Sequence, residues 1–323
     1  MRQPVSLKKI VTSLSLVIAV FFTQGCVQDD LSVCGVNIRF TYTRNLEGID
    51  LFAEEVSRID VFVFDAEGVF AGRYSDEGGR LKNSNYSLAL NLMEGVYTFV
   101  VWGNLLGDYE YTELIPGRTA FADAMLSLKR ENDIKDEHPG SLYFGMEKDM
   151  AIKPGLQTNQ SFIIDMWRDT KSIRVVNKFL PYGGEEISDY DGYTCSITSR
   201  NADYKFDNSI TGSARVQYMP ESFVDSSVAD SILLICDFVT LRQLKNGSTN
   251  SKLTLEYRFP GINYYRKKEY DLINDLLLPA YIDSDFDIRH DYEIELEHDL
   301  ANGSINVTIG DWNKEFNPII LGY

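Results

Sequence analysis

The chain has 323 residues, a formal net charge of −17 and a pI of about 4.6. An acidic body of this kind excludes nucleic acid as a partner, because phosphate binding needs a basic surface. It also excludes a protein that lies flat on an anionic membrane leaflet. The length suits two domains of about 150 residues each, and either half is long enough to bury a core.

The first 25 residues have the pattern of a secretory signal. Basic side chains within residues 2–9 precede the apolar run Ile10–Phe22, and Gly25 and Cys26 follow that run closely. The run is too short to cross a bilayer, whose hydrocarbon core of ~30 Å takes about 20 helical residues. The pattern therefore predicts a signal peptide over residues 1–25.

A cysteine directly after a small residue at this point resembles the lipobox of bacterial lipoproteins. The resemblance implies cleavage between Gly25 and Cys26, acylation at Cys26, and a lipidated tether over residues 26–35. Several acyl chains, each contributing ~0.8 kcal/mol per buried methylene, would hold the protein on a membrane. The removed segment carries three positive charges and no acids, so the net charge changes from −17 to −20. The alternative is an ordinary secretory signal with an incidental cysteine.

Alternating apolar residues predict strands throughout the first half. Val36–Tyr42 alternates as a half-buried strand, whereas Ile59–Asp65 has apolar groups on both faces, as in a strand covered on both sides. The turn Asp65–Gly68 leads into a return strand and so predicts a hairpin. Further strands are expected over residues 86–92, 96–102 and 162–167.

The segment 120–128 has a different spacing. Its apolar residues Phe121, Ala124, Met125 and Leu128 fall at i, i+3, i+4 and i+7. This spacing predicts a short surface helix.

The polar stretch at residues 168–171 separates two similar halves. Many short strands with little helix are typical of all-β proteins, so we expect an N-terminal β-sandwich over residues 36–168 and a C-terminal one over residues 169–323. Asn302-Gly303 predicts a hairpin. The other strands of the second half are expected over residues 173–176, 193–198, 214–218, 231–241, 252–259, 264–270, 290–297 and 305–309, with a helical segment over residues 271–278.

Four cysteines are present, Cys26, Cys34, Cys195 and Cys236. If Cys26 is lipidated, three remain and one of them is unpaired. Cys195 and Cys236 lie in apolar, strand-like runs and could form a cross-strand disulfide in an oxidising compartment. Two buried thiols are the alternative, because reduced cysteine behaves as a small core hydrophobe.

The histidines do not predict a metal site. His290 and His298 would lie ~27 Å apart along an extended strand, too far for one ion. His138 precedes Pro139 in a loop without an obvious partner. All three are therefore interpreted as surface or structural residues.

Calcium binding is also disfavoured. Asp283, Asp285 and Asp287 would share one face of an extended segment, but Ile288 and Ile294 stand where an EF-hand loop needs Gly and Glu. A solvated acidic loop is the preferred interpretation.

No catalytic constellation is apparent. The sequence lacks GxSxG, a P-loop, GxGxxG after a strand, and HExxH, and its 48 acidic residues are too many for one carboxylate pair to stand out. Trp102, Trp167, Trp312 and the 19 tyrosines could form a sugar-stacking face, although most such side chains in a sandwich lie in the core. We expect no enzyme activity, no cofactor and no metal.

Several stretches carry a family resemblance. Three stretches resemble the fimbrial anchor lipoproteins of Bacteroidota of the FimB/Mfa2 type. They are Cys26–Cys34 with the strand after it, Val56–Gly68 and Gly95–Asn104. Residues 172–175, 271–278, 292–294 and 309–312 fit in the same order. The likeness is densest over residues 26–104.

The resemblance implies a fold, a location and a partner. It implies two β-sandwich domains of transthyretin-like topology with short peripheral helices, held on the cell outer membrane by the lipid on Cys26. The function that it implies is anchoring or capping the base of a cell-surface fimbria, with a stalk or other fimbrial subunit as the partner. Subunits in this group join by strand exchange, in which main-chain hydrogen bonds provide the affinity.

The C-terminal tail and an alternative function bear on this expectation. Ile319, Ile320 and Leu321 form a short apolar tail that could act as a donor strand, although apolar strands more often complete their own sheet. The alternative function is a surface glycan-binding lipoprotein. A glycan binder needs a cluster of exposed aromatic rings, whereas an anchor needs an open sheet edge or a docking tail.

Overall fold

A computed structural model describes residues 35–153, 160–182, 191–220, 222–228, 231–244, 249–259, 263–277, 281, 285–310 and 317–321. The strands are β1 Val36–Thr41, β2 Arg58–Phe64, β3 Phe70–Glu77, β4 Leu88–Leu90, β5 Gly95–Gly103, β6 Tyr109–Tyr111, β7 Met125–Leu128, β8 Ile134–Lys135, β9 Tyr143–Ile152, β10 Gln160–Asp165, β11 Trp167–Arg168, β12 Lys171–Phe179, β13 Asp191–Ser199, β14 Asp203–Lys205, β15 Val216–Tyr218, β16 Ser222–Val228, β17 Ser231–Thr240, β18 Lys252–Phe259, β19 Tyr264–Asp271, β20 Asp291–Asp299, β21 Ser304–Gly310 and β22 Asn317–Leu321. The helices are α2 Phe52–Glu55, η2 Gly79–Lys82, η3 Phe121–Asp123, the π-helix η5 Leu272–Leu277 and α3 Asp285–Ile288. The predicted all-β class with short helices is confirmed.

The first sandwich consists of two facing sheets. Their strand orders are β10-β1-β4 and β11-β9-β5-β2-β3. Alternate residues of β1 are buried, and Ile38 and Phe40 pack in one core with Val61, Val101 and Ile164 from the facing sheet and from β10. Within its own sheet β1 lies between β10, which runs parallel to it, and β4, which runs antiparallel.

Strand β2 is covered on both faces, as its apolar pattern predicts. Ile59 and Val61 belong to the core of the first sandwich, whereas Phe62 and Phe64 belong to a second core on the opposite face. The small sheet β14-β7-β6 lies on that side, and the ring of Phe206 meets the ring of Phe62 edge-to-face at 5.0 Å. The β2–β3 hairpin is confirmed.

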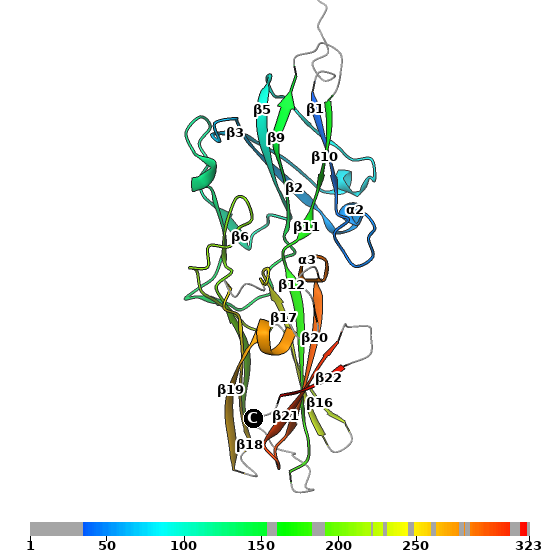
Figure 1. Ribbon diagram of the computed structural model, residues 1–323, viewed down its shortest axis with the longest axis vertical. Coiled ribbons are helices and arrows are strands. Elements are labelled where there is room, and N and C mark those ends of the chain that lie inside the picture. The colour runs from blue at the N-terminus through cyan, green and yellow to red at the C-terminus, as the bar shows by residue number, and fades with distance from the viewer. Residues whose placement is uncertain are drawn as a thin grey trace, which may run out of the picture.

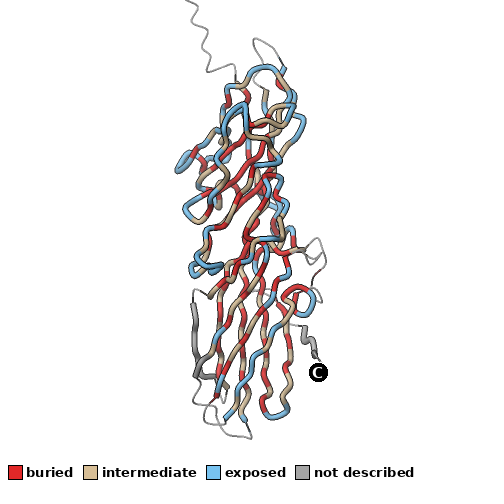
Figure 2. The backbone as a smooth tube through the Cα atoms, turned by 90° about the vertical axis from the view of Figure 1, so that its left-hand side faces the viewer, coloured by how far each residue is buried: buried red, intermediate tan, exposed pale blue. Residues whose placement is uncertain are grey.

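The second sandwich is stacked end to end with the first, which gives an elongated molecule (Figure 1). Its sheets have the orders β16-β17-β12-β20-β21-β22 and β19-β18-β13-β15-β8. Buried and half-buried residues alternate strictly along β12, and Figure 2 shows the same alternation of red and tan along the strands of this sandwich. Leu234, Leu255 and Ile294 are among the residues of its core.

The two halves exchange short strands at their joint. Strand β14, from the second half, pairs with β7 of the first half, and β8, from the first half, pairs with β15 of the second. The connecting residues Asp169, Thr170 and Lys171 are at most 1% exposed. The predicted boundary at residues 168 and 169 falls between β11 and β12, and the division into two separate domains stays a prediction.

The helix predicted over residues 120–128 is wrong. Only Phe121–Asp123 form a short 3-10 turn, and β7 follows it. Ala124, Leu126 and Leu128 are buried at a two-residue period, so Ala124 and Leu128 fit a strand as well as the helical spacing. Pairing with β6 and β14 on either side selects the strand.

Two long strands, β9 and β16, were not predicted. By contrast, the helical segment after β19 is confirmed as η5, and the hairpin at Asn302-Gly303 is confirmed by the pairing of β20 with β21. Gly303 has a φ of 67°, which favours glycine at that turn. Among the described residues, no helix is both long and apolar enough to span a bilayer.

Candidate functional site

The first strand starts at one end of the molecule. Gly25, Cys26 and Cys34 lie outside the described residues, so lipid attachment at Cys26 stays a prediction. Strand β1 starts at the end of the first sandwich that is far from the second (Figure 1). Just beyond its other end, the ring of Tyr42 lies 6.0 Å from the ring of His290, at the joint. A tether that precedes Val36 is therefore attached opposite the second sandwich.

The C-terminal tail belongs to the chain's own sheet. In β22, Ile319 lies opposite Val307 and Leu321 opposite Ile305, with Ile320 between them in register. β22 is the last strand of its sheet, so it pairs on one side only. The residues thus adopt the self-paired arrangement, and their use as a donor strand stays a prediction.

The two described cysteines lie side by side between the sheets of the second sandwich. Cys195 in β13 and Cys236 in β17 are both buried. The Cys236 Sγ also lies 3.9 Å from the hydroxyl of Tyr193. Burial and the neighbouring Cys236 raise the pKa of the Cys195 thiol well above its usual value. The disulfide between them stays a prediction.

The three histidines make contacts within the fold. The His138 Nε2 lies 2.9 Å from the carbonyl oxygen of Asp237. His298 is stacked on Phe179 with ring centroids 4.4 Å apart, and burial lowers its pKa to about 3. The described residues contain no group of three or more potential metal ligands from His, Cys, Asp and Glu.

Lys171 and His290 form a buried contact at the joint. Lys171 Nζ donates to the carbonyl oxygens of Phe286 and Arg289 at 2.8 and 2.9 Å, and it lies 3.1 Å from His290 Nδ1. Burial lowers the pKa of Lys171 to about 7, and burial together with the Lys171 charge lowers that of His290 to about 2. The neutral imidazole therefore accepts from Lys171 at Nδ1 and donates from Nε2 to the carbonyl of Arg44 at 3.3 Å.

The acidic segment and the tryptophans have ordinary structural roles where they are described. Asp285 and Asp287 lie in α3, so they do not share the face of an extended strand, and Asp283 lies outside the described residues. Trp102 is fully buried in the core, as predicted for most aromatic side chains. The half-buried Trp167 is covered by the guanidinium of Arg44 at 4.7 Å from its ring centroid, and Trp312 is not described.

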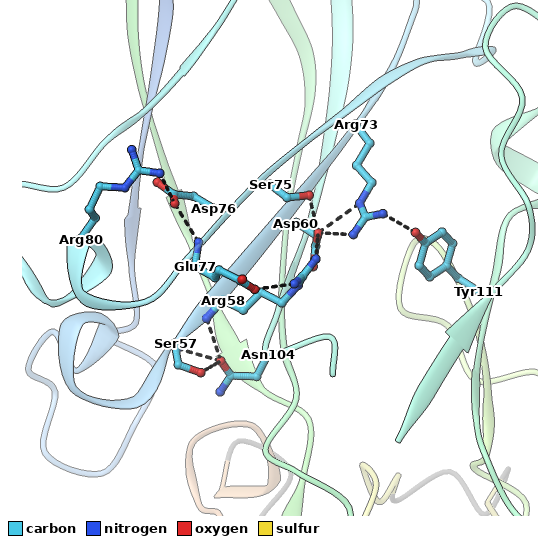
Figure 3. A network of polar contacts seen from close by, with 10 residues as sticks. All are labelled: Ser57, Arg58, Asp60, Arg73, Ser75, Asp76, Glu77, Arg80, Asn104 and Tyr111. Carbon is cyan, nitrogen blue, oxygen red and sulfur yellow. Dashed lines mark hydrogen bonds and ion pairs between the residues drawn. The ribbon is translucent and has the colours of Figure 1, made fainter. Parts of the chain in front are cut away.

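A buried carboxylate organises the polar contacts of the β2–β3 hairpin (Figure 3). The side chain of Asp60 is fully buried and accepts hydrogen bonds from Arg58 Nε at 2.9 Å, Arg73 Nη2 at 2.5 Å and Ser75 Oγ at 2.5 Å. Burial alone would raise the pKa of Asp60, but the hydrogen bonds from Arg58, Ser75 and Arg73 hold it below its usual value. Arg73 also donates to the hydroxyl of Tyr111 at 2.5 Å, which ties the hairpin to β6.

Sequence reasoning missed this network, although one signal was available. Asp60 is a charged residue inside the apolar run of a strand covered on both faces. A carboxylate in that position has to be paired, and Arg58 and Arg73 are the nearest cations along the hairpin. The pairing fixes a hairpin and a sheet surface, which is a structural role.

The end of β5 explains one of the stretches that carry the family resemblance. A Cβ on Gly103 would lie 3.0 Å from the Tyr143 Cβ, so the tight contact there favours glycine. Asn104 has a φ of 57°, and its Oδ1 accepts from the backbone nitrogens of Ser57 and Arg58 at 2.8 and 3.2 Å (Figure 3). Gly103-Asn104 therefore attaches the end of β5 to the start of β2.

Comparison with known proteins gives the same assignment along nearly the whole chain. Residues 31–318 match the family model of the Fimbrillin-A associated anchor proteins Mfa1 and Mfa2. The chain is 22% identical over 303 residues to the minor fimbrium anchoring subunit Mfa2 of Porphyromonas gingivalis, covering 89% of each protein.

Solved structures share the fold. The fimbrial anchor protein Mfa2 from P. gingivalis superposes with a TM-score of 0.66 at 19% identity, over 86% of this chain and 97% of that one. A protein from Bacteroides thetaiotaomicron gives a TM-score of 0.70 at 22% identity, over 89% of this chain and 98% of that one. Because the family model covers most of the residues, the chain belongs to the family of Fimbrillin-A associated anchor proteins Mfa1 and Mfa2.

Proposed function

We propose that this chain is a non-enzymatic outer-membrane lipoprotein that anchors or caps the base of a cell-surface fimbria. Membership of the anchor family supports a fimbrial subunit role. The observation that carries the proposal is the start of β1 at the end of the molecule opposite the second sandwich (Figure 1). A lipid on Cys26 would leave the second sandwich directed away from the membrane and accessible to a stalk subunit.

The proposed contact with the stalk uses the edge of the six-stranded sheet. β22 is one of the two edge strands of this sheet and pairs with β21 alone, so it can leave the sheet without breaking an interior pairing. Strand exchange would return the lost main-chain hydrogen bonds in the partner's sheet. Ile319, Ile320 and Leu321 are the residues proposed to contact the stalk subunit.

The lipid anchor is tested by Cys26→Ala in cells that make the fimbria. We expect loss of the acylated amino terminus by mass spectrometry, and release of the protein and of fimbriae into the medium. Cys34→Ala is the matched control, because it removes a cysteine from the same segment and should leave attachment intact. Wild-type protein that stays on the cell with an unmodified amino terminus would contradict the proposal.

The strand contact is tested separately by deleting residues 317–323. We expect a folded, cell-attached protein that no longer retains fimbriae, because one edge strand is removed and Cys26 is kept. Circular dichroism and thermal unfolding establish that the shortened protein folds. A folded, cell-attached deletion variant that retains fimbriae normally would exclude the donor role without affecting the lipid anchor.

A further inference from the structure

A polar trough of about 360 Å³ lies on the outer face of the five-stranded sheet of the second sandwich. Cys195, Ile197 and Leu255 of β13 and β18 point into the core. The residues between them therefore point outward. Ser196, Thr198 and Thr254 form the floor of the trough, with Ser196 opposite Thr254 in the β13–β18 register.

Long cationic side chains surround this floor. The trough is lined by Arg200, Arg215, Lys252 and Lys267, with Glu269 as the one acid among its described residues. Lys252 and Lys267 have partners, since Lys252 Nζ lies 3.4 Å from Glu269 and Lys267 Nζ lies 3.5 Å from Glu256. A local excess of positive charge is unexpected in a chain with a net charge of −17.

Two of these cations are available to a ligand. Within the part of the chain that the structure describes, the guanidinium groups of Arg200 and Arg215 make no hydrogen bond or ion pair, and both residues are exposed. The floor hydroxyls of Ser196, Thr198 and Thr254 likewise make none there. The trough thus combines two unpaired guanidinium groups with hydroxyls that can both donate and accept.

The lining restricts the class of ligand. No aromatic or aliphatic residue is among the described lining residues. A neutral sugar would find no ring to stack on, and a protein partner would find no apolar anchor. A carboxylate suits a guanidinium, which binds it through two parallel hydrogen bonds, and sugar hydroxyls suit the floor.

We propose that this trough binds an acidic sugar, a carboxylate-bearing saccharide unit, with Arg200 and Arg215 on the carboxylate and the Ser and Thr hydroxyls on the ring hydroxyls. Its volume falls in the range of small-molecule sites, roughly 300–1,000 Å³. The proposal does not depend on the anchoring function, because neither the predicted lipid site nor β22 lines the trough.

The test uses the purified full-length protein and calorimetric titration with four probes: a galacturonate trimer, 3′-sialyllactose, lactose and a hexaglutamate peptide. We expect binding of at least one of the two acidic sugars and none of lactose, with affinity that falls as salt rises from low to physiological concentration. Arg200→Gln with Arg215→Gln should weaken that binding about tenfold or more, because two charge-assisted contacts are lost.

Two variants control for charge and for geometry. Arg118→Gln with Lys153→Gln removes the same charge from exposed positions on the first sandwich and should change affinity less than about twofold. Arg200→Lys with Arg215→Lys keeps the charge without the planar fork and should bind with intermediate affinity. The unfolding temperature of the Arg200→Gln, Arg215→Gln variant should match the wild type.

Three results would overturn the proposal. The first is that neither acidic sugar binds. The second is an equal loss of affinity in the trough variant and the charge-matched control. The third is tighter binding of hexaglutamate than of either acidic sugar, which would identify an acidic protein segment as the occupant.

Discussion

Lys171 Nζ lies 3.1 Å from His290 Nδ1 in the joint between the two sandwiches. The Nδ1 atom accepts a hydrogen bond from Lys171 because the imidazole is held neutral. Lys171 is at most 1% exposed and His290 is 6% exposed, so neither can exchange its partner for water. The joint therefore depends on a histidine that does not take up a proton in the folded state.

We predict that the protein loses stability as pH falls from 6.5 to 5. The folded pKa of His290 is about 2 and that of His298 about 3, both below the unfolded value of 6.5. The unfolded chain then binds protons that the folded chain does not, so stability is complete above pH 6.5 and declines below it. The two histidines together account for about 3 kcal/mol between pH 6.5 and 5.

This prediction is checked by urea unfolding across that range. His298→Asn and His290→Gln should each reduce the slope of stability against pH, whatever their stability at pH 7. A slope of stability against pH that is identical in the wild type and both variants would show that the two histidines do not cause the loss of stability. Most Asp and Glu side chains titrate below pH 5, and burial raises the pKa of Asp169 and of Glu293. The comparison with the two histidine variants separates the histidine contribution from theirs.

Asp60→Asn is expected to cost about 3 kcal/mol of unfolding free energy. The substitution keeps the shape of the side chain but leaves Arg58 and Arg73 beside a buried neutral group. Glu77→Gln is the matched control, because Glu77 bonds the same Arg58 at 2.6 Å while 70% exposed, and it should cost less than about 1 kcal/mol. Similar losses in the two variants would show that burial of Asp60 is not the cause.

The lowered pKa of Asp60 also predicts that the stability of the protein falls in acid. The pKa of Asp60 in the folded protein lies below its value in the unfolded chain. The contribution of Asp60 to the free energy of unfolding is therefore present above the unfolded pKa and is lost as the pH falls through the folded pKa. The wild type and Asp60→Asn should therefore converge in stability at low pH. Chemical denaturation at pH 7 and pH 3 measures the difference.

Gly145→Ala in β9 is expected to destabilise the first sandwich by about 1–3 kcal/mol. An added Cβ would lie 2.8 Å from the Ile164 Cγ2 and 3.1 Å from the Met166 Cγ, so both neighbours would have to shift. Gly79→Ala is the control, since a Cβ there meets nothing within 4 Å, and it should be close to neutral. A loss for Gly145→Ala no greater than that for Gly79→Ala would contradict this packing.

Cys195 and Cys236 are expected to resist alkylation in the folded protein and to react after unfolding. Burial keeps the pKa of Cys195 high, so little thiolate is present at pH 8. Peptide mapping by mass spectrometry after iodoacetamide treatment, with and without guanidinium, measures this. A Cys195–Cys236 peptide pair that survives unfolding without reductant would establish the predicted disulfide instead, and rapid labelling of the folded state would contradict both arrangements.

Local pattern was sufficient for strands whose burial alternates or is complete. β2, β12 and the β20–β21 hairpin are confirmed because their apolar residues reflect the faces that they bury. β9 escaped prediction because its pattern is irregular along its length, and it pairs with β5 through a register shift between Tyr97 and Phe99.

Other features depend on contacts between distant parts of the chain. β8 and β14 have two and three residues and exist through pairing across the joint, so no local signal identifies them. The lining of the trough comes from four strands and the loops beside them, and each of its residues looks like an ordinary surface residue in the sequence. Asp60, by contrast, could have been identified as paired from its apolar surroundings.

The parallel pairing of β1 with β10 determines how the molecule would respond to mechanical load. Six residue pairs join the two strands, from Val36 opposite Gln160 to Thr41 opposite Asp165. A pull on the chain before Val36, directed along the strand and away from the second sandwich, loads those pairs in shear rather than one after another. β1 also lies between two neighbours, so a tether under tension would have to detach a central strand from both of them at once.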